Sequence, residues 1–190
     1  MAGPVSVGAV IVPTEFDWSI IPGVGDSKQV SPLKRVAVFE QARQLKRAGK
    51  LDYEVVSISA KRIDRIGIAP AIKEALTRAL TAVVGRQKQA SPEVCVIKLD
   101  GGLRAPAIFP LQETIIKGDA KEPVIGLASI IAKVTRDTYM ERLGRKVEFV
   151  PYDFATHKGY GTKQHRAVIA ATGLSRHHRA SFCRNIRLKT

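Results

Sequence analysis

Short apolar runs recur along the chain and predict β-strands. The first, Val5–Val12, is almost continuously apolar and is bounded by Pro4 and Pro13. A run of this kind is typical of a strand that is buried on both faces. Further strands are predicted from β-branched and apolar runs at Tyr53–Ala60, Val94–Leu99 and Thr114–Lys117.

Segments of helical periodicity separate these runs. A capping serine, Ser31, predicts a helix over about Pro32–Ala48 that ends at Gly49. Two later helices are marked by apolar residues on one face, namely Ile72, Ala75, Leu76, Ala79 and Val83 in one and Leu127, Ile130, Ile131 and Val134 in the other. The latter should cover about Pro123–Leu143, and a last helix Lys163–Ala171. Strands that alternate with helices indicate an α/β layer architecture.

The size of the chain and its charge narrow the function classes. With 190 residues it suits one domain, expected as an α/β core over about 1–145 and a helical, basic C-terminal part over about 146–190. Lys and Arg total 31 against 17 Asp and Glu, a net charge of +14. This excess favours a polyanionic partner, nucleic acid or an anionic membrane, although a basic, solvated surface would give the same total.

The C-terminal segment is the most basic part of the chain. It has no acidic residue after Ser175 and carries Arg176, Arg179, Arg184, Arg187 and Lys189. Such a segment is often a nucleic-acid contact.

Cysteine usage and hydropathy bear on location. Cys95 and Cys183 are too few for a disulfide framework, which favours a reducing cytoplasm. No apolar stretch approaches the length of a membrane span. The apolar run near the N-terminus has no basic region before it, so a signal peptide is not expected.

Two aspartates stand at predicted strand ends, where an active site would need them. Asp100 ends one strand and Asp119 follows the next. Open α/β sheets bind ligands at strand ends, and two carboxylates there could share a hard divalent cation. Asp-Gly and Gly-Asp are also common turn dipeptides, and the pattern alone does not separate the two interpretations.

Two polar segments further on could contact a substrate. Ser129, Lys133 and Asp137 recur every four residues and form either a phosphate-contacting face or a solvated stripe with a Lys–Asp pair. In His157–Thr162, two glycines flank Tyr160, whose ring could stack on a sugar or base. A plain loop before a helix explains this composition equally well.

Other catalytic and metal-binding motifs are not found in the sequence. The four histidines show no metal-binding spacing, so structural or surface roles are the default for them. There is no phosphate-binding glycine loop, serine elbow or zinc motif.

Seven blocks in order resemble bacterial ribonuclease HII. They are AGPV from Ala2, DSK from Asp26, LDG from Leu99, KGDAK from Lys117, ASIIAKVTRD from Ala128, HKGYGT from His157 and HRASF from His178. The resemblance implies a ribonuclease-H-like mixed sheet flanked by helices, with a helical C-terminal part. It also implies an endonuclease that cleaves the RNA strand of RNA–DNA hybrids and nicks duplex DNA 5′ of embedded ribonucleotides, in the repair of such DNA.

The same resemblance assigns roles to single residues. The family holds Mg²⁺ or Mn²⁺ with four carboxylates, and Asp100 and Asp119 match the third and fourth. Tyr160 matches the tyrosine that senses the ribose at the scissile bond, and Lys28 and Lys133 lie near the substrate backbone. Ser129 and Arg179 complete the expected substrate contacts, and the expected assembly is a monomer without a membrane partner.

One departure from the family concerns its first two carboxylates. In the family a strand with an Asp-Glu-x-Gly-Arg-Gly motif precedes the AGPV block, whereas here that block follows Met1 directly. We therefore expect Met1 to be an internal residue of a longer gene product, and the chain as given to be inactive or nearly so. The alternatives are a shortened, catalytically dead RNA–DNA-binding module and a basic ribosome-associated protein, which would not explain Asp100, Asp119 and the ASIIAKVTRD block together.

Overall fold

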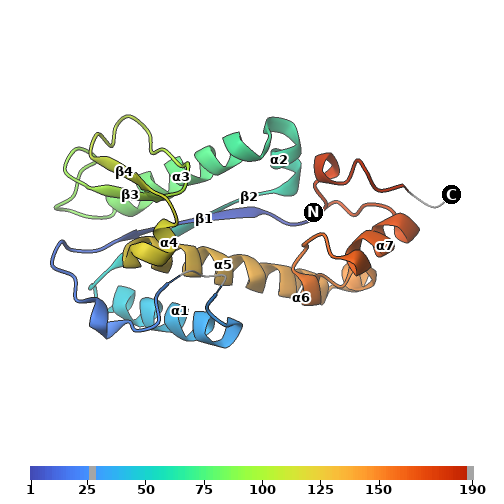
Figure 1. Cartoon of the computed structure of the whole chain (residues 1–190), viewed down its shortest axis with the longest axis horizontal. Coiled ribbons are helices and arrows are strands. Elements are labelled where there is room, and N and C mark those ends of the chain that lie inside the picture. The colour runs from blue at the N-terminus through green and yellow to red at the C-terminus, as the bar shows by residue number, and fades with distance from the viewer. Residues whose placement is uncertain (26–28, 188–190) are drawn as a thin grey trace. The chain divides into compact units, whose positions relative to one another are not determined.

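The computed structural model describes residues 1–25 and 29–187 (Figure 1). It divides into two compact units, each formed from separate stretches of the chain. Unit 1 comprises Met1–Val5, Ser57–Ile72 and Thr135–Thr190, and unit 2 comprises Ser6–Val56 and Lys73–Val134. No helix in the described part of the chain combines the length and the apolarity of a membrane span.

Unit 2 contains the strands and most of the long helices. In chain order these elements are β1 (Val5–Ile11), η1 (Trp18–Ile20), α1 (Pro32–Arg47), β2 (Asp52–Ile58), α3 (Ile68–Gly85), β3 (Ile97–Asp100), β4 (Gln112–Ile115), α4 (Gly118–Lys121) and α5 (Pro123–Gly144). β1, β2, α3 and α5 continue into unit 1. In the described residues the strands form two small sheets, β1 with β2 and β3 with β4. The predicted α/β architecture is confirmed.

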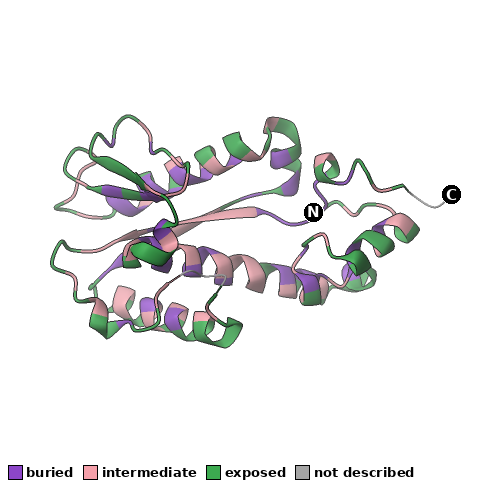
Figure 2. Cartoon of the chain, in the orientation of Figure 1, coloured by how far each residue is buried: buried purple, intermediate pink, exposed green. Residues whose placement is uncertain are grey.

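Both faces of β1 pack against apolar clusters of unit 2. Ala9 belongs to a core formed mainly with α3, which Val7 and Ile11 also contact. Val10 faces the opposite way, into a core formed by α1 and the first half of α5. Successive side chains of a strand point to opposite faces, so β1 packs on both sides. The prediction of a strand buried on both faces is too strong, because only Ala9 is buried and the other residues of β1 are half-buried. Figure 2 shows the buried faces of these helices turned towards the strands.

Gly8 explains how β1 comes so close to α5. A Cβ atom on Gly8 would lie 2.4 Å from the backbone oxygen of Ala128. No other residue lacks this atom, so the glycine in the apolar run permits the close approach.

Unit 1 is helical and is built around a small aromatic core. Its elements are α2 (Ala60–Ile66), η2 (Val147–Tyr152), α6 (Phe154–His157), α7 (Lys163–Thr172), η3 (Ala180–Phe182) and the second half of α5. Ala2, Met140, Leu143, Phe149, Tyr152 and Phe154 form the core. The Asp64 carboxylate on α2 accepts hydrogen bonds from the backbone amides of Ala180 and Ser181. This carboxylate ties the C-terminal segment to α2.

Some element boundaries differ from the prediction for local reasons. The amides of Val94 and Cys95 bond back to the Ser91 carbonyl, so β3 begins only at Ile97. Ser59 accepts a hydrogen bond from the Arg62 amide and caps α2, so β2 ends at Ile58. Serine at such a position is the ordinary N-cap signal, which the sequence analysis overlooked here.

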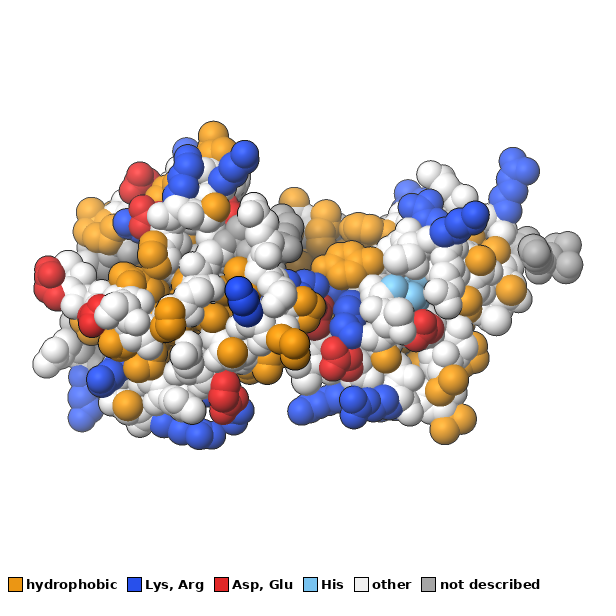
Figure 3. All heavy atoms as spheres, turned by 60° about the horizontal axis from the view of Figure 1, so that its bottom comes forward, with side chains coloured by type: hydrophobic (Ala, Val, Ile, Leu, Met, Phe, Trp, Pro, Cys, Tyr) orange, Lys and Arg blue, Asp and Glu red, His pale blue; other side chains and the backbone are white. Residues whose placement is uncertain are grey.

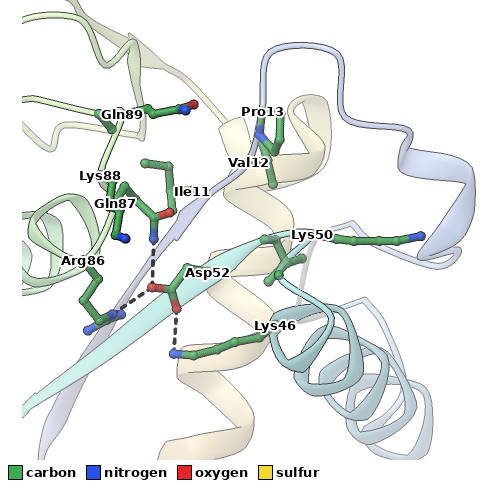
Figure 4. A pocket seen from close by; sticks show the side chains of 13 residues that line it. Ile11, Val12, Pro13, Lys46, Lys50, Asp52, Arg86, Gln87, Lys88 and Gln89 are labelled. Carbon is green, nitrogen blue, oxygen red and sulfur yellow. Dashed lines mark hydrogen bonds and ion pairs between the residues drawn. The ribbon is translucent and has the colours of Figure 1, made fainter.

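A buried carboxylate, Asp52, organises one end of unit 2 (Figure 4). It is 9% exposed, and it binds Arg86 Nε at 2.8 Å and Lys46 Nζ at 2.7 Å. Burial alone raises the pKa of Asp52, but hydrogen bonds from Arg86 and Lys46 outweigh it, so that pKa lies below its usual value. These residues line an open cavity of about 720 Å³. Among the described residues, none of those predicted as site residues lines this cavity.

Replacing Asp52 with Asn should lower the free energy of unfolding by roughly 1–3 kcal/mol, because Arg86 and Lys46 would lose their shared buried partner. Glu54→Gln is the matched control, since Glu54 also binds Arg86, at 2.8 Å, from a more exposed position. Its loss should stay below about 1 kcal/mol. Urea denaturation at pH 7 measures both values, and equal losses would contradict the importance of burial at Asp52.

Candidate active site

The candidate active site lies where β3 and β4 end. The two strands are parallel, and Asp100, the last residue of β3, pairs with Ile115, the last residue of β4. Parallel pairing brings the carboxyl ends of both strands to one edge of the sheet. Asp119 follows β4 in the first turn of α4, so the same edge carries both predicted ligands.

A hydrogen bond from backbone to side chain joins the two segments that carry the aspartates. The Gly118 amide donates to Oδ1 of Asp100 at 2.9 Å. Lys117 turns the chain in the left-handed conformation, with φ of 57°. A Cβ atom on Gly118 would lie 2.7 Å from Cδ1 of Ile125. Glycine at 118 thus lets α4 pack closely against Ile125 of α5. Its amide binds Asp100, and Asp119 is the next residue.

The donor set suits a hard divalent cation. Two half-buried carboxylates supply the oxygen ligands that Mg²⁺ prefers, and Mg²⁺ ordinarily keeps several water ligands beside one or two carboxylates. Glu122, the nearest acidic residue along the chain, is paired with Lys98 at 2.7 Å. Within residues 1–25 and 29–187, no group of three or more His, Cys, Asp or Glu is placed to hold a metal ion. Asp100 and Asp119 are therefore a partial ligand set that fits such an ion.

The start of α5 brings another predicted segment towards this edge. A Cβ atom on Gly126 would lie 2.8 Å from the backbone oxygen of Asp119 and 3.2 Å from backbone atoms of Gly25. Gly25 immediately precedes the DSK block, whose residues 26–28 lie outside the described part of the chain. Lys28, predicted as a substrate contact, is one of these residues. Glycine at 126 permits the close packing of these segments.

Ser129 and Lys133 lie one turn apart on α5. Both are half-buried and both interact with neighbouring groups, as does Asp137. They share a face of the helix because residues four apart are neighbours on its surface. Their predicted contact with substrate phosphates stays a prediction.

The Tyr160 ring is half-exposed in unit 1, with 51% of the residue accessible. The Arg136 guanidinium lies over the ring, 5.1 Å from its centroid. Gly159 has φ of 76°, and its Cβ position would lie 2.6 Å from the backbone oxygen of Ala2. The glycine before the tyrosine is thus required where this loop meets the AGPV segment.

Two arginines of unit 1 bind the backbone of the AGPV segment. Arg179 donates from Nε to Gly3 O at 3.0 Å and from Nη2 to Pro4 O at 2.8 Å. Arg136 donates to Pro4 O at 3.0 Å and to Ala2 O at 3.1 Å. Burial, together with the neighbouring Arg136, lowers the pKa of Arg179 to about 10. The guanidinium of Arg179, a predicted substrate contact, is engaged with backbone carbonyls.

Arg136 was missed by the sequence analysis, although it lies in the ASIIAKVTRD block. Its position beside Lys133 and Asp137 suggested a surface stripe, whereas its side chain is mostly buried. The one pattern in the sequence that could have indicated Arg136 is the lack of any apolar residue between Thr135 and Thr138. A solvated stripe explains that pattern just as well.

Three histidines of unit 1, His157, His165 and His178, are buried together. Nε2 of His165 lies 3.0 Å from Nε2 of His178, and the rings of His157 and His165 stack with centroids 4.0 Å apart. The sequence analysis assigned no site to these residues. Their spacing along the chain matches no metal motif, so only the fold brings them together.

The basic side chains visible on one face of the molecule do not form a single patch (Figure 3). On the face drawn in Figure 3, Lys and Arg side chains are spread among apolar, polar and acidic ones. The net charge of +14 therefore acts as a diffuse attraction for a polyanion on that face.

Comparison with known proteins agrees with the sequence blocks. The profile of the family described as Ribonuclease HII matches residues 1–185. Ribonuclease HII of Bacillus anthracis (strain CDC 684 / NRRL 3495) is 41% identical over 182 residues, which are 96% of this chain and 64% of that relative. The chain thus spans less than two thirds of the length of this relative.

Solved structures confirm the ribonuclease-H-like fold. The PCNA:RNase HII complex from Archaeoglobus fulgidus contains a chain with a TM-score of 0.70 and 29% identity, covering 100% of this chain and 92% of that one. Bst-RNase HIII, solved in complex with Mn²⁺, has a TM-score of 0.65 and 19% identity, with 90% and 58% covered. The second likeness concerns the fold alone.

The buried histidines should make stability depend on pH. Burial lowers the pKa of His165 and of His178 to about 4, whereas both titrate near about 6.5 in an unfolded chain. Between these values the unfolded state binds more protons, so stability is full above about pH 6.5 and falls on acidification. Each histidine contributes a slope of at most about 1.4 kcal/mol per pH unit, which chemical denaturation between pH 7 and pH 5 measures.

His165→Phe serves as the comparison for that measurement, because it keeps an aromatic ring and removes one titrating group. Its slope should be smaller by up to about 1.4 kcal/mol per pH unit. An unaltered protein whose stability is the same at pH 7 and pH 5 would contradict the neutral, buried state of these rings.

Proposed function

Because the chain belongs to the ribonuclease HII family, we propose that it is an endonuclease for RNA within RNA–DNA duplexes. It hydrolyses the RNA strand of hybrids and nicks duplex DNA on the 5′ side of embedded ribonucleotides. The observation that carries the proposal is that Asp100 and Asp119 follow two parallel strands to one sheet edge, where the Gly118 amide binds the Asp100 carboxylate. Such a substrate belongs to the cytoplasm, and the protein acts there as a monomer.

Asp100 and Asp119 would hold Mg²⁺ or Mn²⁺. When bound, such a cation supplies Lewis-acid chemistry, neutralising the negative charge that develops on the phosphodiester oxygens. The Gly118 amide contributes by holding one oxygen of Asp100, which fixes the orientation of that carboxylate. Bst-RNase HIII, which has a similar fold, was solved with Mn²⁺.

Ser129, Lys133 and Lys28 contact the substrate backbone in this proposal. Phosphate contacts of lysine and serine position a duplex without reading its sequence, as an enzyme that acts at any embedded ribonucleotide requires. Arg179 reaches backbone carbonyls inside unit 1, so its contribution to substrate binding runs through the AGPV segment.

Tyr160 senses the ribose that bears the 2′-hydroxyl. Its ring is half-exposed, and its opening to solvent leaves one side for a sugar. Aromatic side chains stack on nucleotides without dependence on base identity, and the 2′-hydroxyl distinguishes RNA from DNA. This arrangement supports selection of a ribonucleotide in any sequence.

A catalytically silent module that binds RNA–DNA hybrids is the second candidate function. It is favoured by the two-carboxylate ligand set, since the described residues offer no larger metal-binding group. The cleavage measurement below separates the two functions, because a silent module would bind the same duplex and leave it intact.

In the full-length gene product, Asp100→Asn and Asp119→Asn should each lower the cleavage rate at an embedded ribonucleotide by at least about 100-fold, because an amide is a poor ligand for a hard cation. In Asp100→Asn the side-chain carbonyl can still accept from the Gly118 amide, so thermal stability should change little. The control is Glu113→Gln on the exposed side of β4. Unchanged rates in both Asp variants, measured with Mg²⁺ and with Mn²⁺, would overturn the assignment.

In a full-length active form, Tyr160→Ala should reduce cleavage at a single embedded ribonucleotide roughly tenfold to 100-fold, since stacking on one nucleotide contributes about 1–3 kcal/mol. The melting temperature should fall little, because the ring is half-exposed. Tyr139→Ala removes another exposed tyrosine of unit 1 as a control. A Tyr160 variant with full activity and a lowered melting temperature would assign the ring to packing.

A further inference from the structure

The buried histidines of unit 1 come from three segments of the chain. His157 ends α6, His165 lies in α7, and His178 lies in the loop after α7. They are 8%, 0% and 4% exposed. Phe154 packs edge-on against His157 and His165, with ring centroids 6.1 Å and 5.7 Å away.

The direction of each hydrogen bond fixes where the protons are. The backbone amide of Ser175 donates to Nδ1 of His178 at 2.9 Å, so this nitrogen is an acceptor and the proton of His178 is on Nε2. That proton points to Nε2 of His165, 3.0 Å away. His165 consequently carries its proton on Nδ1, which donates to the Tyr160 carbonyl at 2.8 Å.

His157 is fixed in the same way. The Gly159 amide donates to its Nδ1 at 3.1 Å, and its Nε2 donates to the Tyr152 carbonyl at 2.6 Å. Both nitrogens of all three rings are therefore used, and each ring is neutral. A metal ion between His165 and His178 is excluded, because Nε2 of His178 carries a proton and has no lone pair to offer.

The chain of hydrogen bonds ends at the loop that carries Tyr160. The carbonyl of Gly159 accepts from the Ala2 amide at 2.9 Å, and the Tyr160 amide donates to the His157 carbonyl at 2.9 Å. With the bond from His165, the backbone on both sides of Tyr160 is fixed. The ring itself remains half-exposed, so its position relative to a ligand depends on this backbone.

Stability alone does not require polar rings here. Apolar residues of similar volume would bury the same surface without hydrogen bonds that must be satisfied, whereas a fully satisfied polar network specifies one geometry. In this cluster, the group whose position the hydrogen bonds determine is the backbone carbonyl of Tyr160.

We propose that His178 and His165 are positioning residues, whose hydrogen-bond relay from the Ser175 amide to the Tyr160 carbonyl sets the Tyr160 ring against the ribose of the substrate. The proposal rests on the proposed function, because it assumes that Tyr160 contacts the ribose. Neither histidine touches the substrate. Their effect passes through the loop backbone.

The first part of the test does not depend on activity. Nitrogen-15 NMR of the imidazole rings should show His165 protonated on Nδ1 and His178 on Nε2. His178→Phe removes the relay and keeps an aromatic ring, and it should increase hydrogen exchange at the amides of Tyr160 and Thr162. The opposite tautomers, or unchanged exchange in His178→Phe, would overturn the relay.

The second part measures cleavage at a single embedded ribonucleotide. His178→Phe should lower kcat roughly tenfold to 100-fold, the scale expected for a misplaced group, with KM within about twofold. His178→Gln can still donate towards Nε2 of His165, so it should recover most of the lost rate and serves as a second variant if His178→Phe does not fold.

Phe154→Leu is the matched control, because it disturbs the packing of the same cluster without removing a hydrogen bond. At equal loss of melting temperature, its kcat should stay within about twofold of the unaltered protein. An equal loss of kcat in Phe154→Leu and His178→Phe would show that the histidines act only through packing, and it would overturn the proposal. If the unaltered full-length gene product does not cleave, the proposed function fails, while the tautomers and the exchange rates still decide whether the relay positions the loop.

Discussion

The hydrogen bond from the Gly118 amide to the Asp100 carboxylate is the constraint on which the candidate site depends. β3 and β4 are only four residues long, and their parallel register brings two strand ends together without fixing the side chains there. The bond from Gly118 ties the turn after β4 to the last residue of β3. Asp119 is the next residue, so its position follows from that bond and from the left-handed turn at Lys117.

In unit 1, hydrogen bonds from side chains to the backbone likewise fix the position of a chain segment. The AGPV segment there is held by Arg136 and Arg179, which donate to three successive backbone carbonyls. Charge-assisted bonds of this kind are stronger than neutral ones, and they offset part of the cost of burying a guanidinium. With the histidine relay, they fix the backbone around Tyr160 from two directions.

The sequence predicted the regular elements well where a cap or a period marks them. Ser31 accepts a hydrogen bond from the Lys34 amide and starts α1 where predicted, and the apolar faces predicted α3 and α5. Asp100 and Asp119 could be singled out because strand ends are visible in the pattern of apolar runs. Ends of short strands were less well predicted, since backbone bonds such as those to Ser91 leave no mark in side-chain periodicity.

The histidine cluster and the two buried arginines could not be predicted from the sequence. His157, His165 and His178 share no helical face or strand, and only the packing of α6, α7 and the following loop brings their rings together. Arg179 stands among basic residues typical of a nucleic-acid contact, yet it is 9% exposed. Charge patterns indicate what a surface can attract, whereas burial is decided by contacts between residues far apart in the chain.

The most direct measurement of the central claim is a titration of the protein with Mn²⁺, followed by NMR of the backbone amides. Manganese is paramagnetic and broadens the signals of nuclei close to it. If Asp100 and Asp119 hold the cation, the amides of Asp100, Gly101, Asp119 and Ala120 should broaden first, and Asp119→Asn should abolish this effect at the same concentration. Broadening centred on Asp52 or Asp64, with the ends of β3 and β4 unaffected, would contradict the account.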